Sequence, residues 1–535
     1  MKRPFTDRTN AEKTILNDPP SAVENELDPS QQSYLVQNYA KFSLIDYYEK
    51  FQYGNQSDGE KAFTAAIGTL RRSANTDLKK WANKIASNDF EIIRRANATE
   101  YWRKLRVSEK EKENDALAIE AMYEELNQRL KQKMGGSGPM KPSSVATTKR
   151  RRASSGRVEV LSAVVDRLIQ NAPNTSETPN CQWSTDLDTC FRKFQLLAAT
   201  AIAEQTEEGV PLEMHIHELL AIQGILLVKP EQHSKMLLDA FGGNDSLADL
   251  HGYLTKKWLM DCPEFTAEYG HTMQTLVDKY QTKHIRLKEV TAGLADVALK
   301  MNEAESRATN AIRRLLERVP CKTLLDIDSF SETDIWSTFA DPVLSSLMSD
   351  PENGIHLRWT NKKVKGAEQL IRPDAIVSLI KQLRWGGHAG VGEVKISEPT
   401  SNNYNLALDL VRISMLSKTL VNSEDLKAVL GFQVNGFHIT FYLMELLRKG
   451  IYTVVEIGDL ELPSSVDKFD SFTTNKSLRT LVHLAHTLSK LPPPPISKND
   501  VQGLNSMKIP NMVMDDFEAL ISLKRDRSLP CVARF

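Results

Sequence analysis

Three charged residues interrupt two apolar stretches in the C-terminal part of the chain. Asp374 follows a proline in "IRPDAIVSLI", and Glu393 and Lys395 lie in "HAGVGEVKISE". Burying an unpaired charge is costly, so charges in such segments usually have a partner, a metal ion or a chemical role. Two carboxylates a few ångströms apart form a hard-oxygen site for Mg²⁺, and a lysine beside them can stabilise the charge that develops on a phosphate.

The segments around these residues have the composition of β-strands. Side chains two apart on a strand point to the same face, so Glu393 and Lys395 are expected to share one face. If the two strands pair as a hairpin through "KQLRWGG", with Gly386-Gly387 in the turn, Asp374 lies beside Glu393. The sequence therefore predicts a Mg²⁺ or Mn²⁺ site at two carboxylates, with the lysine orienting or deprotonating an attacking water.

Pro373-Asp374 followed by Glu393-Val394-Lys395 resembles the motif of the PD-(D/E)XK nuclease superfamily, which has the restriction-endonuclease-like fold. The expected order of helix, strand with Asp, strand with Glu-x-Lys, helix and strand is also similar to that family's core. The resemblance implies metal-dependent phosphodiester hydrolysis. It further implies that Asp374, Glu393 and Lys395 are catalytic, and that Asp374 and Glu393 hold the metal.

Members of that family often add a carboxylate from the preceding helix. By this analogy Glu332 is the first candidate for a further metal ligand and Asp341 the second. Three basic residues are candidates for contacts with a nucleic-acid backbone. Arg412 and Lys418 lie on the helix expected after the Glu-x-Lys strand, and Lys363 lies in a lysine-rich loop after "IHLRW".

Simpler interpretations exist for each of these residues. Glu393 and Lys395 could form an ordinary ion pair on the surface of a sheet, worth a fraction of a kcal/mol. Asp374 could cap a turn after Pro373. Arg412 and Lys418 could belong to solvated faces of their helix. The apolar neighbours on both sides of Glu393 and Lys395 argue against the surface pair.

The expected fold class is multidomain, with a mainly α-helical N-terminal two-thirds followed by an α/β restriction-endonuclease-like domain whose mixed sheet is flanked by helices. The expected parts are 1–30, disordered; 31–134, helical; 135–158, a flexible basic linker; 159–320, helical with a long helix or coiled-coil arm; 321–490, the nuclease-like domain; and 491–535, a proline-rich tail.

The linker contains a basic cluster, Lys149-Arg150-Arg151-Arg152, followed by Ser154. Such a cluster on a flexible tether is typical of a nuclear-import signal or of a nucleic-acid contact. It also suits a basophilic kinase with Ser154 as acceptor, whose phosphate would offset part of the positive charge. A solvated run of charge without a role is the alternative.

The overall composition excludes several classes. The chain has 535 residues, 26% of them charged, and a formal net charge of −1, so it is not a globally basic nucleic-acid binder. Its five scattered cysteines match no zinc pattern, and no GxxxxGK[ST] loop occurs. No apolar run has the roughly 18 to 20 residues of a membrane span, so we expect a soluble intracellular protein without a membrane partner.

Together these observations predict a Mg²⁺- or Mn²⁺-dependent nuclease in the nucleus, with the cytoplasm as alternative. Its substrate is expected to be DNA, with RNA not excluded, and its helical part suits a second copy of the chain or a helical protein partner. The alternative is a helical interaction or scaffold protein whose nuclease-like module binds nucleic acid or protein without cutting.

Overall fold

The computed structural model gives the fold of most of the chain. It describes residues 44–51, 56–72, 76–86, 88–135, 145–170, 187–205, 209–325, 330–360, 372–397, 403–424, 426–491, 505–522, 531 and 533. The segment expected to be disordered, 1–30, lies outside the described residues. The chain divides into two compact units, Met1–Ala118 and Ile119–Phe535, and each is described by itself.

The first unit is helical, as predicted. It consists of α3 (Leu44–Phe51), α4 (Gln56–Leu70), α5 (Thr76–Ile85) and the first part of α6 (Asn88–Gly135). Its small core is rich in aromatic side chains, because Tyr47, Tyr48, Phe63 and Trp102 are almost completely buried. The ring centroids of Tyr48 and Trp102 are 5.3 Å apart, within the usual range of aromatic pairs.

The second unit begins with helices that correct two predictions. Helix α7 (Val145–Gln170) covers most of the segment expected to be a flexible linker; lysine, arginine and alanine are good helix formers, which accounts for it. The expected long arm between 268 and 319 is three helices: α12 (Ala267–Gln281), α13 (Leu287–Ala298) and α14 (Glu303–Leu316). The chain turns at Lys283, whose φ is 62°, and Asn302 caps α14. The coiled-coil prediction is therefore wrong for this stretch.

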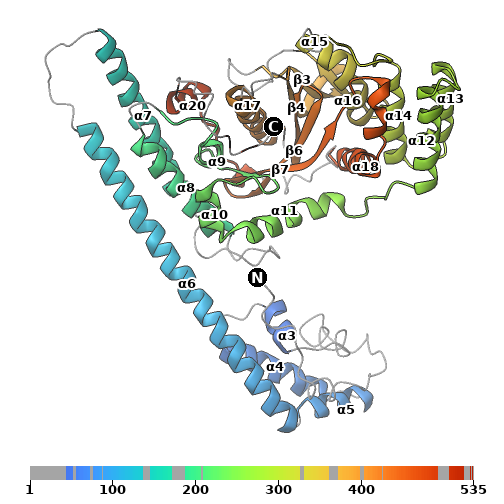
Figure 1. Ribbon diagram of the computed structural model, residues 1–535. Coiled ribbons are helices and arrows are strands. Elements are labelled where there is room, and N and C mark those ends of the chain that lie inside the picture. Colours follow the sequence, from blue (N-terminus) through green and yellow to red (C-terminus); the bar gives the residue numbers. More distant parts are fainter. Residues whose placement is uncertain are drawn as a thin grey trace. The chain divides into compact units, whose positions relative to one another are not determined.

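A seven-stranded mixed sheet forms the centre of the second unit (Figure 1). Its strand order is β1-β7-β6-β5-β4-β3-β2. The strands are β1 (Ile225–Val228), β2 (Ile355–Trp359), β3 (Ala375–Lys381), β4 (Arg384–Lys395), β5 (Ala428–Asn435), β6 (His438–Arg448) and β7 (Ile451–Glu461). The pairs β1–β7 and β4–β5 are parallel, and the others are antiparallel. The predicted mixed sheet is confirmed.

The strand β1 comes from the region predicted to be wholly helical. Its four residues are all buried, and Ile225 pairs with Tyr452 at the edge of β7. A four-residue apolar run has no periodicity that separates strand from helix, which is why the pattern does not reveal it. The sheet therefore takes one edge from outside the predicted 321–490 domain, and that boundary is wrong.

Helices cover both faces of the sheet, and alternate residues of a strand serve the two sides. In β3, Ile376 belongs to the core under α17 (Asn403–Ser423), whereas Val377 belongs to the opposite core. Helices α14, α16 (Asp341–Met348) and α18 (Asn475–Ser489) lie on that second side (Figure 1). Successive side chains of a strand point to opposite faces of the sheet, so a sheet with two buried faces is expected to supply both cores in this way.

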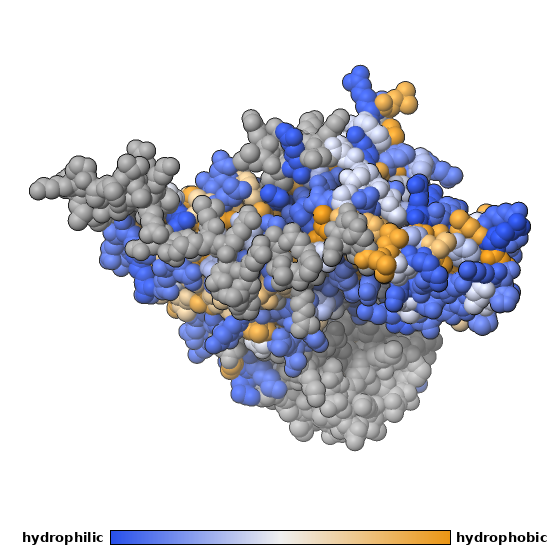
Figure 2. Space-filling view, turned by 45° about the horizontal axis from the view of Figure 1, so that its top comes forward, coloured by the Kyte–Doolittle hydropathy of each residue, from blue (hydrophilic) through white to orange (hydrophobic). Residues whose placement is uncertain are grey.

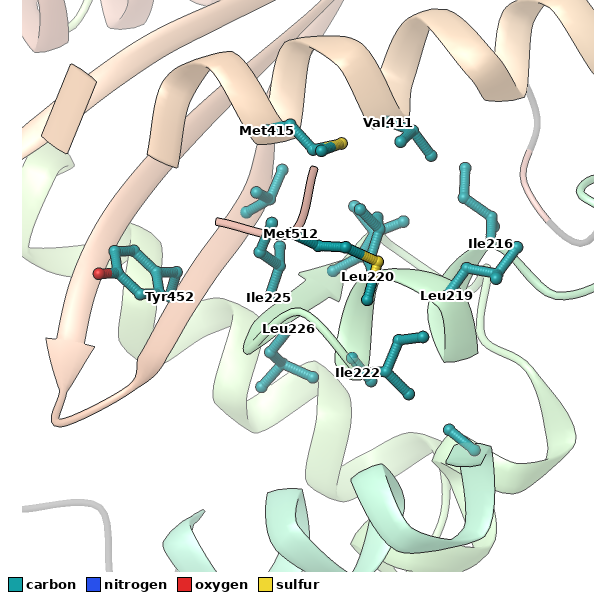
Figure 3. Close-up of a cluster of buried hydrophobic side chains, with 14 of the residues drawn as sticks. Ile216, Leu219, Leu220, Ile222, Ile225, Leu226, Val411, Met415, Tyr452 and Met512 are labelled. Atoms are coloured by element: carbon teal, nitrogen blue, oxygen red, sulfur yellow. The ribbon is translucent and has the colours of Figure 1, made fainter. Parts of the chain in front are cut away.

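The C-terminal segment is part of the core, which corrects the prediction of a separate tail. Its helix α20 (Met514–Leu520) buries Phe517 completely, and Ile521 bridges to Val210. Figure 3 shows Met512 between Met415 of α17 and Leu220 of α9 (Ile216–Ala221). Apolar residues at three- and four-residue spacing give this segment one buried face.

The exposed surface is mainly hydrophilic on the face shown in Figure 2, with smaller hydrophobic patches between the polar residues. Exposed large apolar side chains are scattered over several elements, and the most exposed include Leu325, Leu383 and Leu299. None of the described helices is both long and apolar enough to cross a membrane.

Candidate functional site

The hairpin of β3 and β4 brings the predicted residues together. Asp374 immediately precedes β3, and Ala375 pairs with Gly392, the neighbour of Glu393. The Asp374 Oδ2 atom accepts a 2.9 Å hydrogen bond from the backbone N–H of Val394. The sequence-based expectation that Asp374 lies beside the Glu-x-Lys triplet therefore holds.

The turn of this hairpin differs from the prediction. Gln382 and Leu383 form it, with φ values of 50° and 60°, whereas Gly386 and Gly387 lie within β4. Successive left-handed residues are typical of the type I′ turn, whose twist matches that of the strands. The glycine at 387 serves packing, because a Cβ atom there would lie 2.4 Å from Oε2 of Glu424.

The ammonium group of Lys395 lies among carboxylates from three other elements. Its Nζ atom is 3.5 Å from Oε1 of Glu332, 3.6 Å from Oδ2 of Asp409 and 3.9 Å from Oδ2 of Asp374. It also donates a 2.7 Å hydrogen bond to the carbonyl of Val394. Burial alone would lower the pKa of Lys395, but the surrounding carboxylates outweigh it and raise that pKa. The amine is therefore charged at neutral pH.

Glu393 is the most strongly perturbed acid of the cluster. Its side chain is 3% exposed, and Oε1 has no hydrogen-bond partner among the described residues. Burial raises the pKa of Glu393 well above its ordinary value, and the negative charges of Asp374 and Asp409 raise it further. Lys395 and Arg412 oppose this effect without cancelling it. Glu393 therefore binds a proton more tightly than an ordinary glutamate does.

Asp409 is a member of the cluster that the sequence analysis did not assign. It projects from α17 and is 1% exposed, and its Oδ1 atom is 3.3 Å from Nη1 of Arg412. Burial raises the pKa of Asp409 to about 6, although Lys395 and Arg412 pull in the opposite direction. The signal was an aspartate inside the apolar run "LALDLVRI", the same kind of signal that singled out Asp374.

Gln433 is a further buried polar residue beside Glu393. The two residues pair across β4 and β5, and Gln433 is 3% exposed. Its Nε2 atom donates a 2.8 Å hydrogen bond to the carbonyl of Leu406, which fixes the amide. Its Oε1 atom is left without a hydrogen-bond partner among the described residues.

Of the two carboxylates considered on the preceding helix, Glu332 is the one at the site. It lies in α15 (Glu332–Asp334), whose start is fixed by hydrogen bonds between Ser331 and Asp334, and about half of its side chain is exposed. Asp341 instead accepts a 2.7 Å hydrogen bond from Nε1 of Trp359. Asp341 therefore serves the packing of a tryptophan.

Lys418 is not available for a nucleic-acid contact, which corrects that prediction. It is completely buried, and its Nζ atom donates to the carbonyls of Gln223 at 2.7 Å and Pro510 at 3.2 Å. Burial lowers the pKa of Lys418 to about 7. The face of α17 that carries it is covered by α9 and the C-terminal segment, neither of which the sequence pattern places there.

The remaining candidates are only partly described. Arg412 lies beside the cluster, with 36% of its side chain exposed. Lys363 lies outside the described residues. The basic residues Lys149, Arg150, Arg151 and Arg152, together with Ser154, fall within α7, but their side chains are not among those described.

The oxygen atoms of the cluster suit a divalent cation in type but are not arranged around one. Among the described residues, no group of three or more His, Cys, Asp or Glu side chains lies in a metal-holding arrangement. The donors are nevertheless of the kind that Mg²⁺ and Mn²⁺ prefer. Buried oxygens of Glu393, Asp409 and Gln433 have no hydrogen-bond partner there, and a cation beside Asp374 and Glu393 would compensate their charge.

Comparisons with protein-family models, with curated proteins and with solved structures gave no match to the chain. The structure itself defines the class: a mixed seven-stranded sheet with helices on both faces, and a carboxylate–lysine cluster where β3 begins and β4 ends. The functional conclusion rests on that cluster.

Proposed function

We propose that the sheet-containing unit is a metal-dependent phosphodiesterase of the restriction-endonuclease-like type, acting on DNA. The observation that carries the proposal is the position of Lys395 Nζ, within 4 Å of carboxylates from three other elements and beside the buried Glu393. Carboxylates that can hold a divalent cation, beside a lysine that can stabilise charge on a phosphate, suit metal-assisted hydrolysis of a phosphodiester.

Each residue has a distinct role in this proposal. A Mg²⁺ or Mn²⁺ ion held by Asp374 and Glu393, with Glu332 as a further ligand, would polarise the scissile phosphate and lower the pKa of a bound water. Lys395 donates to the phosphate as negative charge develops on it. Because the surrounding carboxylates raise the pKa of Lys395, we assign it charge stabilisation and orientation of the water rather than proton abstraction.

Asp409 and Arg412 support this arrangement from α17. Asp409 lies 3.6 Å from Lys395 and 3.3 Å from Arg412, so it is positioned between the two cations. We infer that Asp409 positions the ammonium group, and that the partly exposed Arg412 contacts a phosphate of the bound strand.

The second candidate function is a module that binds nucleic acid without cutting it. It is favoured by one observation: the ammonium group of Lys395 is already paired with carboxylates of the protein. Folds of enzymes do persist in members that have lost the chemistry.

Incubation of the full chain with supercoiled plasmid, single-stranded DNA and RNA separates the two functions. We expect cleavage with Mg²⁺ or Mn²⁺ and none with a chelator, with Ca²⁺ giving little cutting because its coordination is looser. Binding of the same substrates without cleavage under every metal condition would favour the second function.

The nuclear location remains part of the proposal and rests on the basic cluster. Replacement of Lys149, Arg150, Arg151 and Arg152 by alanine should exclude a tagged protein from the nucleus, and Ser154→Glu should weaken import. If the fourfold variant still accumulates in the nucleus, the basic cluster is not the import signal.

A further inference from the structure

The tip of the β3–β4 hairpin extends beyond its neighbouring strands. The last pair of β2 with β3 is at Leu379, and the backbone N–H of Ile380 still donates a 2.8 Å hydrogen bond to the carbonyl of Gly354, whereas pairing of β4 with β5 begins only at Gly390. Between these limits, Ile380 pairs with Trp385 and Lys381 pairs with Arg384. Residues 380–385 thus form the end of the hairpin, with 381–384 beyond the neighbouring strands, and are called the tip ribbon below.

Apolar side chains on the tip ribbon face solvent. Leu383 is 97% exposed and Trp385 is 49% exposed, although β4 is buried from Ala389 to Val394. Leu383 also has a φ of 60°, a conformation that glycine or asparagine adopts at lower cost. The positive φ of this leucine costs stability, and a backbone outlier of this kind points to function.

A guanidinium group packs against the ring of Trp385. The guanidinium carbon of Arg358 lies 4.0 Å from the centroid of its ring, and the His356 ring meets it edge-on at 5.6 Å. Arg384 is exposed beside it, and the sequence from 375 to 392 contains no Asp or Glu. One acidic side chain, that of Glu424, lies against the hairpin at Gly387.

We propose that the tip ribbon is a stacking platform for a single-stranded segment of nucleic acid. A base stacks on the face of Trp385 opposite Arg358, Leu383 packs against the next base, and Arg384 contacts the backbone. This combination of an aromatic face with guanidinium groups is what sequence-tolerant binding of single strands uses, and an apolar wedge acts in the same way between bases. The inference deepens the proposed function, because it assigns a strand-holding surface to the same sheet.

The spacing between the platform and the cluster fits one continuous strand. Seven residues of β3 separate Asp374 from Lys381, or roughly 23 Å at about 3.3 Å per residue. A single strand of several nucleotides covers this distance. A strand of that length reaches both the platform and Lys395.

The test measures binding in a chelator, so that it does not depend on cleavage. The full chain is titrated into a fluorescently labelled 20-nucleotide oligodeoxythymidylate, and anisotropy gives Kd. We expect Trp385→Ala to weaken binding by about 5- to 100-fold, the range of one lost base stack. Trp385→Phe, which keeps a ring, should retain most of the affinity. Leu299→Ala removes an 86% exposed leucine from the turn after α13 and should leave Kd unchanged.

Leu383→Gly distinguishes a loss of binding from a loss of folding, because it should weaken binding without lowering thermal stability. Glycine relieves the positive φ, so the thermal midpoint should hold or rise, whereas loss of the apolar side chain should raise Kd. If Trp385→Ala and Leu383→Gly each bind the oligonucleotide with the same Kd as Leu299→Ala, the proposed stacking platform is wrong. The exposed apolar residues of the tip ribbon would then suit a protein partner instead. If Trp385-dependent binding occurs but no metal cleaves DNA, the platform stands and the hydrolytic proposal fails; the reverse result removes the platform alone.

Discussion

The Asp374 carboxylate accepts its 2.9 Å hydrogen bond from the backbone N–H of Val394, the residue between Glu393 and Lys395. One side chain thereby fixes the start of β3 against the end of β4. A slip of one residue in this pairing would turn Glu393 and Lys395 to the other face of the sheet. The hydrogen bond therefore sets which face of the sheet carries the site.

Asp374→Asn is expected to remove metal binding while keeping the fold. The amide oxygen can accept the same hydrogen bond from Val394, but one of the two charges that would hold the ion is lost. Wild type should gain thermal stability with Mn²⁺, by about 2.7 kcal/mol at a hundredfold excess over Kd, and the variant should gain little. Without metal the variant should be at least as stable, because Glu393 loses a like-charged neighbour.

Differential scanning fluorimetry with and without Mn²⁺ measures this difference. Asp467→Asn is the matched control. It removes one carboxylate charge from an exposed ion pair with Lys322, and Asp467 is not a member of the cluster. Equal Mn²⁺ shifts in wild type and Asp374→Asn would show that the ion does not bind at this carboxylate.

Lys395→Ala is expected to abolish cleavage and to retain metal binding. The variant removes the cation between Glu332, Asp409 and Asp374, so the remaining carboxylates should bind Mn²⁺ at least as well. Cleavage rates under single-turnover conditions, together with the Mn²⁺-induced shift in thermal midpoint, test both statements. Lys322→Ala removes an exposed lysine and should change neither quantity. A Lys395→Ala protein that cuts at the wild-type rate would end the assignment of a catalytic role.

The stability of the metal-free protein is expected to fall as pH rises from about 4 to 7. The pKa of Asp409 is about 6 in the folded protein against an ordinary 3.8. A raised pKa means that the folded state binds the proton more tightly, so this contribution is complete below 3.8 and is lost as pH rises through about 6. Its size is about 1–3 kcal/mol.

Urea denaturation in a chelator at several pH values measures this contribution. Asp409→Asn has no proton to lose, so its profile should be flatter than that of wild type. Stabilisation by Mn²⁺ should show the opposite trend and grow with pH, because the ion competes with protons for Glu393, whose pKa is also raised. Parallel profiles for wild type and Asp409→Asn would contradict the ionisation of this group in that range.

Phe517→Ala is expected to destabilise the second unit by about 3–5 kcal/mol, because it empties a fully buried aromatic site in α20. Val513→Ala changes a 40% exposed residue four positions earlier and should cost much less. Denaturant midpoints of the two variants test whether residues 505–522 belong to the core. Similar small effects from both would mean that the C-terminal segment contributes little to stability.

The hairpin could be predicted from the sequence because its parts are local. Asp374, Glu393 and Lys395 lie on two adjacent strands joined by a short turn, so alternation along each strand is enough to place them together. The polar turn itself was harder, since Gly386 and Gly387 have the better turn composition and yet lie within β4. Packing of Gly387 against Glu424, which a local pattern does not contain, accounts for the glycine there.

The parts that could not be predicted depend on distant contacts. Asp409 reaches the cluster because α17 packs along β4 and β5, and the helical pattern alone gives its face but not its partner. Lys418 was a candidate for a nucleic-acid contact, yet it is buried and donates to the carbonyls of Gln223 and Pro510, which lie far apart in the sequence. Its burial follows from where the C-terminal segment lies, which is a property of the whole fold.

The parallel pairing of β1 with β7 bears on how the chain folds during synthesis. Translation produces Ile225 long before its partner Tyr452, so β1 leaves the ribosome with no strand to pair with. Until then, the apolar residues of β1 can be buried only against neighbouring segments such as α8 (Leu187–Glu204) and α9, which share its core. The sheet acquires its β1 edge only after the long intervening sequence has formed β2 to β7, which favours slow folding. A piece consisting of 321–490 alone would present the buried strand β7 as an open edge to other copies of itself.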